Sequence, residues 1–292
     1  MPSSSPPTTR IGLIGAGIGG SFSPALHTAE ARAHGFPLTY TLFDTEVDRR
    51  PLAEQLRAAA DAGFAGVNIT HPYKQTVLPL LDMMSPQARE LGAVNTVVFE
   101  NDQMVGHNTD GAGYADAFTR EMAGVETSRV LQCGAGGAGS AVAHAQLGLG
   151  VEHLVLHDPD QRRRATLLAD LVRRFGADRV SAAGTNLVDE LARATGLVNA
   201  SPVGMAAHPG VPVPPSALHA DMWVSDVVYM PVETELLLTA RRRGIRTLSG
   251  IHMCVHQAAR AFELITRRPA DVNRMLANLA GLLDQRKTDA RA

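Results

Sequence analysis

The sequence predicts an α/β protein of two domains, because short apolar runs alternate with helical patterns along most of its length. At 292 residues the chain exceeds the usual size of a single domain. Glycine-rich segments follow two of the apolar runs, at Gly15–Gly20 and Gly134–Gly139, as is typical of strand-to-helix turns. We therefore expect an amino-terminal α/β substrate domain and a Rossmann-type dinucleotide-binding domain.

The substrate domain is expected over residues 1–112. Its alternating patterns predict, in order, strand Arg10–Ile14, helix Pro24–His34, strand Leu38–Phe43, helix Arg50–Ala62 and strand Gly66–Ile69. The β-branched runs Val94–Phe99 and Gln103–Gly106 flank polar turn residues and predict a hairpin that closes the domain.

The dinucleotide-binding domain is expected over residues 113–246. It comprises helix Tyr114–Met122, strand Val130–Cys133, helix Ala138–Leu147, strand His153–His157, helix Arg162–Phe175, strand Leu197–Asn199 and strand Trp223–Val228. Residues 247–292 hold two further helices, Ile251–Thr266 and Ala270–Gln285. We expect at least the first of these to return to the substrate domain, so that cofactor and substrate meet in a cleft between the domains.

Composition indicates a small-molecule partner. Hydrophobic residues make up 45% of the chain, charged residues 19%, and the net charge is −2, so no overall field attracts nucleic acid or an anionic membrane. No stretch is long enough to span a bilayer, and the polar leader Met1–Thr9 is interpreted as a frayed tail. Cys133 and Cys254 lack metal-ligand spacing, which predicts free thiols, no metal site and a cytoplasmic location.

The stronger glycine-rich loop follows the apolar run Val130–Cys133 and opens an alanine-rich helix, which is the context of a dinucleotide fingerprint. Gly134 permits the tight turn, Gly136 lets the backbone approach a pyrophosphate, and Gly139 allows close helix packing. The pyrophosphate would lie at the helix N-terminus. The alternative is a turn that only packs a helix against a strand. The predicted cofactor loop comprises Gly134, Ala135, Gly136, Gly137, Ala138 and Gly139.

Asp158 favours the cofactor interpretation, because it ends the next predicted strand about 20 residues beyond the loop. A carboxylate there accepts hydrogen bonds from the adenosine ribose and repels a 2′-phosphate, which favours NAD over NADP. Against this, Arg163 lies within the basic run Arg162–Arg164, which could attract a phosphate or simply form a solvated face. NADP therefore stays open as an alternative cofactor.

The loop Gly15–Gly20 is interpreted as unrelated to NAD, because it continues into Ser21-Phe22-Ser23-Pro24 rather than into an alanine-rich helix. Only Asp44 keeps a dinucleotide site open here. We expect the glycines to shape a loop that exposes the hydroxyls of Ser21 and Ser23, with Pro24 in the first turn of the next helix.

Further polar residues gather at predicted strand ends. Asn68–Lys74 leaves a buried strand, Asn95 lies in an apolar strand, and Asn108–Gly111 follows the hairpin. Each has a plainer interpretation: Lys74 as a surface lysine, Asp110 as a helix N-cap, and the asparagines as structural groups.

Taken together, these motifs closely resemble the shikimate/quinate dehydrogenase family. The matching segments run in the family's order over nearly the whole chain: Ser21–His27, Asn68–Lys74, Gly92–Thr96, Asn108–Gly111, Gly134–Gly139, Asn199–Met205, and Gly250 with Met253 and Gln257.

The resemblance implies that Lys74 and Asp110 form the catalytic pair. Which of the two side chains carries the proton is left open. It assigns substrate binding to Ser21, Ser23, Thr70, Asn95, Asp110, Tyr229 and Gln257. Met253 lies four residues before Gln257, so both are expected to point into the cleft. Besides the loop, Asp158 and Arg163, the cofactor contacts are Ala200, Val227 and Gly250.

Two departures from the family pattern are informative. Phe22 stands where the family usually has a basic residue, so hydroxyls and other groups must bind the substrate carboxylate. NADP-using members of the family carry a sequence like Asn-Arg-Thr/Ser where this chain has His157-Asp158-Pro159. The difference favours the NAD-dependent quinate/shikimate branch. The alternatives are an NADP-dependent biosynthetic shikimate dehydrogenase, a non-catalytic regulatory protein, and a reductase of amino-substituted or pterin-like substrates. The sequence leaves open whether the chain is a monomer or a homodimer.

Overall fold

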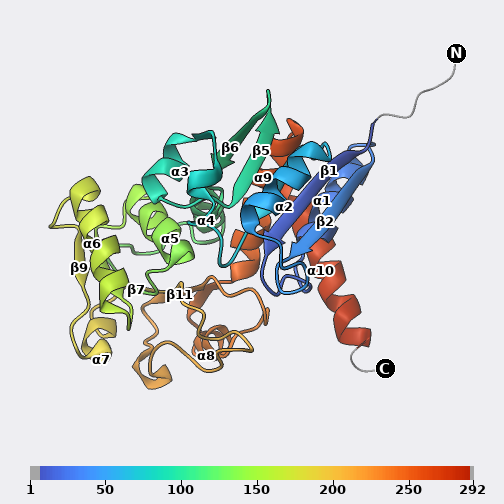
Figure 1. Cartoon of the computed structure of the whole chain (residues 1–292). Helices are drawn as coiled ribbons and strands as arrows, with labels where there is room; N and C mark the ends of the chain where they lie inside the picture. The colour runs from blue at the N-terminus through green and yellow to red at the C-terminus, as the bar shows by residue number, and fades with distance from the viewer. Residues whose placement is uncertain (1–6, 290–292) are drawn as a thin grey trace, which may run out of the picture. The chain divides into compact units, whose positions relative to one another are not determined.

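A computed structural model describes residues 7–289 of the chain, which divide into two compact units (Figure 1). The first unit comprises residues 7–109 and 257–289, and the second comprises Asp110–His256. The boundaries expected from the sequence lay at residues 112 and 246. The second boundary falls later because helix α9 (Gly250–Thr266) is continuous and its first turns are grouped with the second unit.

The first unit is built on a mixed sheet of strand order β2-β1-β3-β5-β6-β4. The first three strands of the chain are parallel, and the hairpin β5–β6 adds antiparallel pairs. Its turn residues Asn101 and Asp102 both have positive φ, as a two-residue hairpin turn requires. The strands are β1 (Thr9–Gly15), β2 (Leu38–Asp44), β3 (Gly66–Ile69), β4 (Met83–Met84), β5 (Thr96–Glu100) and β6 (Gln103–His107).

Helices cover both faces of this sheet. Apolar side chains of the strands alternate in direction, so Ile14 and Val67 pack in one cluster with Leu56, whereas Ile11 packs in another with Ile265 of α9. The helices are α1 (Ser23–Ala33), α2 (Leu52–Asp61), the 3₁₀ turn η1 (Leu78–Leu80), α3 (Pro86–Leu91), the end of α9, and α10 (Val272–Asp289).

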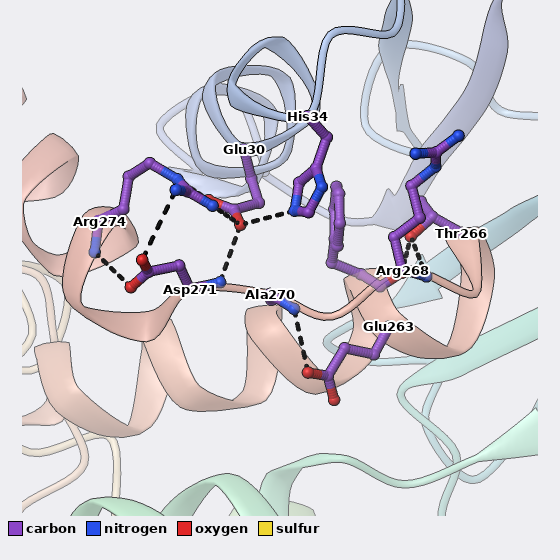
Figure 2. Close-up of polar contacts among 9 residues, drawn as sticks. Glu30, His34, Glu263, Thr266, Arg268, Ala270, Asp271 and Arg274 are labelled. Carbon is purple, nitrogen blue, oxygen red and sulfur yellow. Dashed lines mark hydrogen bonds and ion pairs between the residues drawn. The ribbon is translucent and has the colours of Figure 1, made fainter.

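The red C-terminal helix α10 lies beside the blue helix α1 (Figure 1), where a buried carboxylate joins them. The Glu30 side chain is fully buried, and it accepts hydrogen bonds from Arg274 Nε at 2.9 Å, Arg274 Nη2 at 2.6 Å and the Asp271 amide at 2.8 Å (Figure 2). Burial by itself raises the pKa of Glu30, but these hydrogen bonds and the charges of Arg274 and His34 outweigh it and lower the pKa. An ion pair of opposite charges and a backbone amide donor therefore hold the start of α10 against α1.

The second unit carries a parallel sheet of order β12-β11-β10-β7-β8-β9. Counted within the unit this is the order 6-5-4-1-2-3, the strand order of a Rossmann fold. The strands are β7 (Arg129–Cys133), β8 (His153–His157), β9 (Val180–Ala182), β10 (Gly196–Asn199), β11 (Trp223–Asp226) and β12 (Arg246–Leu248).

Two hydrophobic clusters cover the two faces of the parallel sheet. Val130 packs with Leu154 in one cluster, and the neighbouring Leu131 packs with Val155 in the other. The helices of this unit are α4 (Asp110–Glu121), α5 (Gly137–Gly148), α6 (Gln161–Phe175), α7 (Leu187–Leu191), the 3₁₀ turn η2 (Pro215–Ala217), α8 (Glu235–Arg242) and the start of α9.

Every strand and helix expected from the sequence is present, with ends that shift by a few residues. Two strands are shorter than expected. β5 begins at Thr96 instead of Val94, so Asn95 precedes the strand. β11 stops at Asp226 instead of Val228, because the Asp226 carboxylate accepts the Val228 amide at 3.0 Å and turns the chain. Thr9, expected in the frayed leader, belongs to β1, and residues 1–6 lie outside the described part. Within the described residues no helix is both long and apolar enough to cross a membrane.

Candidate active site

In the first unit the sheet order reverses between β1 and β3, which creates a topological switch point. Ligands of open α/β sheets bind outside the carboxyl ends of the strands at such a point. The loops that follow these strands touch: the Ala16 amide donates to the His71 carbonyl at 3.0 Å, and a Cβ on Gly15 would lie 2.3 Å from Thr70. Both loops carry residues predicted to bind substrate.

The loop after β1 presents the two predicted serines. Phe22 between them is 2% exposed, whereas Ser21 and Ser23 are half-buried, and the Ser21 hydroxyl accepts the Ser23 amide at 3.2 Å. Asp44, at the end of β2, accepts the amides of Gly17 and Ile18, each at 3.0 Å. Asp44 was the one residue that allowed a dinucleotide site in this loop to be considered. Its carboxylate is instead hydrogen-bonded to the loop itself.

Asn95 and Gln257, both predicted to bind substrate, belong to one polar network of the first unit. The Asn95 Nδ2 group donates to Thr109 Oγ1 at 2.9 Å, and Gln257 Oε1 lies 3.5 Å from both Asn95 Nδ2 and Thr109 Oγ1. Asn95 Oδ1 accepts the Thr109 amide at 2.8 Å and the Thr96 hydroxyl at 3.1 Å. The helix α9 thereby brings Gln257 to the strand region of Asn95, across a large sequence separation.

Lys74 lies in the turn after β3 and is half-buried. Its carbonyl accepts the Val94 amide at 2.8 Å, directly before Asn95 in the chain. The Tyr73 amide donates to the Thr70 carbonyl at 2.8 Å and closes the turn. The backbone of Lys74 is therefore fixed beside the polar network.

The second unit has its own switch point, between β7 and β10. Gly134 follows β7 with φ +107°, and a Cβ there would lie 2.5 Å from the Ala200 carbonyl after β10. A Cβ on Gly139 would lie 2.3 Å from the Gly134 oxygen, so these glycines are required by close packing. Gly136 and Gly137, by contrast, have nothing within 4 Å at that position. Open space therefore faces the first turn of α5, where an anion is favoured.

A glutamine that the sequence analysis did not single out braces this loop. Gln132 is fully buried, and its Nε2 group donates to the carbonyls of Gly134 and Gly139, both at 2.8 Å. Gln146 of α5 donates in turn to Gln132 Oε1 at 2.8 Å. A polar residue inside the apolar strand Arg129–Cys133 was the sequence signal that could have identified it.

Asp158 follows β8 at the position expected for the ribose carboxylate and is 5% exposed. One oxygen accepts the Ala135 amide at 2.7 Å and the other accepts the Asp160 amide at 2.8 Å. These bonds fix the carboxylate against the glycine loop, and each oxygen retains a second lone pair for a ribose hydroxyl. The predicted Arg163 lies beside it, with Nη1 3.9 Å from Asp158 and a side chain that is 54% exposed.

Val227 and Gly250 also come together. A Cβ on Gly250 would lie 2.5 Å from the Val227 carbonyl oxygen, so only glycine lets α9 begin this close to the chain after β11. Met253, expected to share a cleft with Gln257, packs against the hydrophobic core of the second unit and is 8% exposed.

A second buried carboxylate organises the loop after β11. Asp226 is 1% exposed, and its oxygens accept only neutral donors among the contacts described: Asn199 Nδ2 at 3.0 Å, the Val228 amide at 3.0 Å and the Thr234 hydroxyl at 2.7 Å. Burial raises the pKa of Asp226 to about 6, although these hydrogen bonds lower it in part. Asp226 thus ties the segment that carries Val227 and Tyr229 to the end of β10.

Asp110 and Tyr229 are close enough for their charges to interact within the second unit. Partial desolvation of the phenol of Tyr229, a residue that stays 37% exposed, together with the negative charges of Cys254 and Asp110, raises its pKa. Asp110 is 5% exposed and begins α4, where the helix dipole favours a negative charge.

The predicted residues therefore form two groups. Ser21, Ser23, Thr70, Lys74, Asn95 and Gln257 belong to the first unit, and the others belong to the second unit. Lys74 and Asp110 lie in different units, so their pairing stays a prediction. The open glycine loop and Asp158 together fit a nicotinamide dinucleotide.

Comparison with known proteins gives a consistent result. The family model for the shikimate dehydrogenase substrate binding domain matches residues 13–97. A shikimate dehydrogenase (NADP(+)) of Streptomyces avermitilis is 51% identical over 93% of this chain and 95% of its own length. A quinate/shikimate dehydrogenase (NAD(+)) of Corynebacterium efficiens is 47% identical over 93% of this chain and 98% of its own length.

The solved structures include a similar protein with bound cofactor. The quinate dehydrogenase from Corynebacterium glutamicum in complex with NAD superposes with a TM-score of 0.89 at 44% identity, over 94% of this chain and 99% of that chain. The two-domain α/β fold is therefore shared over nearly the full length of both proteins.

Proposed function

This chain belongs to the shikimate/quinate dehydrogenase family of oxidoreductases, and we propose that it interconverts quinate, shikimate or both with the 3-dehydro ketones, using NAD. The observation that carries the cofactor choice is the Asp158 carboxylate, fixed by the Ala135 and Asp160 amides beside the open glycine loop. A carboxylate at this position accepts hydrogen bonds from the ribose hydroxyls and repels a 2′-phosphate.

The substrate is proposed to bind at the switch point of the first unit. Ser21, Ser23 and Thr70 supply hydroxyls, and Asn95 and Gln257 supply amides, which suits a ring with several hydroxyl groups. Phe22 is buried and uncharged, so hydroxyl groups would hold the substrate carboxylate.

Lys74 and Asp110 are proposed to move the proton of the reacting hydroxyl. A nicotinamide cofactor, when bound, would accept the hydride, and Lys74 and Asp110 would take up the hydroxyl proton. Tyr229, on the segment that Asp226 ties to the end of β10, is proposed to contact substrate because it matches a family position near the substrate. Ala200, Val227 and Gly250 complete the cofactor contacts.

The Lys74→Ala variant tests this assignment. General acid–base help supplies about 10²–10⁴-fold, so we expect kcat to fall by roughly that factor while NAD affinity stays nearly constant. The matched control is Gln75→Ala, an exposed neighbour on the same turn, which should leave kcat near the wild-type value. Nearly full turnover in Lys74→Ala would remove Lys74 from the mechanism.

The second candidate is an NADP-dependent shikimate dehydrogenase. The 51% identity to the NADP-named Streptomyces avermitilis protein and the position of Arg163 beside Asp158 favour it. Steady-state kcat/KM for quinate and shikimate with each cofactor decides between the two. A higher value with NADP would replace the first proposal by the second.

Location and assembly complete the proposal. Cys133, which is buried, and Cys254 are not joined in a disulfide, and we propose a cytoplasmic location, where thiols stay reduced. A homodimer is the assembly to test against a monomer, and sedimentation equilibrium measures it directly.

A further inference from the structure

Tyr40 of β2 contributes a phenol to the substrate side of the first unit, although no motif singles it out. Its hydroxyl donates to Asn68 Oδ1 at 2.8 Å. Its ring packs against His27 with centroids 5.1 Å apart, and His27 packs in turn against Phe262 of α9 at 6.0 Å. The ring is thus held between α1, α9 and the sheet, with its hydroxyl directed at the side chain of Asn68.

The bond to Tyr40 and a bond to the Asn95 carbonyl together set which way the Asn68 amide faces. Oδ1 accepts from the phenol, and the Nδ2 group donates to Thr96 Oγ1 at 3.0 Å and to the Asn95 carbonyl at 3.4 Å. Asn68 is 7% exposed, so water cannot readily replace either partner.

The Thr96 hydroxyl transmits this orientation to Asn95. Since Thr96 Oγ1 accepts from Asn68, its single hydrogen is available to donate, and it donates to Asn95 Oδ1 at 3.1 Å. Asn95 Oδ1 also accepts the Thr109 amide, so its Nδ2 group must face Thr109 Oγ1 and Gln257. The amide of Asn95 therefore presents a donor rather than an acceptor on that side.

We infer that Tyr40 is a positioning residue for substrate binding, which acts through Asn68 and Thr96 to fix the orientation of the Asn95 amide. Without the phenol, the buried Asn68 Oδ1 loses the donor described for it, and the side chain is held only through its Nδ2 group. A shift of Asn68 toward another donor lengthens its bond to Thr96, and the Thr96 hydroxyl then holds Asn95 Oδ1 less firmly. The inference rests on the proposed role of Asn95 as a substrate ligand.

The first test is Tyr40→Phe, which keeps the ring and removes only the hydroxyl. We expect the KM for shikimate and for quinate to rise about three- to tenfold, the effect of one weakened hydrogen bond, with kcat and the KM for NAD near their wild-type values. Tyr114→Phe is the matched control, because it removes another buried phenol, from the core of the second unit. A substrate KM unchanged from wild type in Tyr40→Phe would overturn the inference.

A double-mutant cycle tests the route. Thr96→Val interrupts the chain between Asn68 and Asn95, so Tyr40→Phe should add almost nothing to the KM increase that Thr96→Val alone produces. Fully additive effects of the two changes would show that Tyr40 acts by another path and would overturn the proposed route.

Amide exchange separates this inference from the proposed function, because it requires no substrate. The Thr109 amide is protected by Asn95 Oδ1. NMR-detected exchange of this amide should accelerate several-fold in Tyr40→Phe and stay at the wild-type rate in Tyr114→Phe. Absence of turnover in the wild type with either ring acid would instead refute the proposed function, and leave the exchange result to decide on the orientation of Asn95.

Discussion

Both units place a glycine-rich loop after the first strand of a sheet and tie it with an aspartate from the adjacent strand. Asp44 accepts two amides of the first loop, and Asp158 accepts the Ala135 amide of the second. The helix of the second unit begins within the loop at Gly137, whereas the helix of the first unit begins later, at Ser23. A similar topology thus offers backbone amides to an anion in one unit and serine hydroxyls to a ring acid in the other.

The two units also treat their buried carboxylates differently. Glu30 of the first unit is bonded to Arg274, and its pKa is lowered. Asp226 of the second unit meets neutral donors, and its pKa is raised to about 6. Opposite pH dependences follow from the two arrangements, and they can be measured separately.

The largest effect on stability is expected from Arg274→Ala. The change leaves the fully buried Glu30 carboxylate without its cation, and we expect the melting temperature to fall by roughly 5–10 °C at neutral pH. Because the folded pKa of Glu30 is lowered, its contribution is present above its ordinary value of 4.5 and is lost as the pH falls through the folded value.

Arg267→Ala is the control for this experiment, since it removes an exposed arginine that pairs with Glu100 at the surface. Its melting temperature should change by no more than about 2 °C. Equal losses in Arg274→Ala and Arg267→Ala by thermal denaturation would contradict the special role of the buried pair.

For Asp226 we expect the opposite dependence of folding stability on pH in the acid range. With the folded pKa at about 6 and an ordinary value of 3.8, the folded state binds the proton more tightly, so stability should decrease as the pH rises between these values. The loss is on the order of 2–3 kcal/mol. Chemical denaturation across this range should show a smaller decrease in Asp226→Asn than in the wild type, and an equal decrease in both would assign it to another group.

The two glycine loops can be distinguished by single methyl groups. Gly139→Ala forces a Cβ to within 2.3 Å of a backbone oxygen, so we expect the NAD dissociation constant to rise about tenfold or more, as overpacking costs typically 1–3 kcal/mol. Gly19→Ala meets nothing within 4 Å and should bind NAD as the wild type does. Titration of cofactor binding by fluorescence measures both, and similar behaviour of the two variants would contradict the division of roles.

Asp158 and Asp44, which lie at the ends of β8 and β2, are compared by their effect on cofactor preference. Asp158→Ala should weaken NAD roughly tenfold through loss of charged hydrogen bonds, and should weaken NADP much less. Asp44→Ala should leave the preference between the cofactors unchanged, because its partners are amides of the first loop. Equal losses for NAD and NADP in Asp158→Ala would remove the ribose argument.

The sequence predicted the main strands and helices because their hydrophobic periodicity is strong. It predicted the glycine loop of the second unit because the spacing of its glycines is typical of a dinucleotide-binding turn. It did not predict β4, β9 and β12, whose two or three residues are too short for a pattern. Helix α8 was missed although Thr234 supplies an N-cap, with its hydroxyl 3.3 Å from the Leu237 amide. α3 likewise has a start signal, Ser85 before Pro86, and an end signal at Gly92.

Site residues could be predicted where a local sequence motif indicates their chemistry. They were harder to predict where tertiary packing determines which side chains meet. Gln132 could have been noticed as a polar residue in an apolar strand. Tyr40 could not, because nothing in its own segment indicates that its hydroxyl meets Asn68 from another strand. Met253 packs against the core of the second unit, and whether it also faces a substrate cleft stays a prediction.

Phe22 has a consequence for how an acid would reach the proposed site. With a buried, uncharged ring between the two serines, the anion would be recognised through hydroxyl dipoles at short range instead of through a long-range Coulomb field. Added salt screens such a field but hardly weakens contact hydrogen bonds. Capture of the substrate carboxylate by Ser21 and Ser23 should therefore depend less on ionic strength than capture by a basic residue at position 22 would.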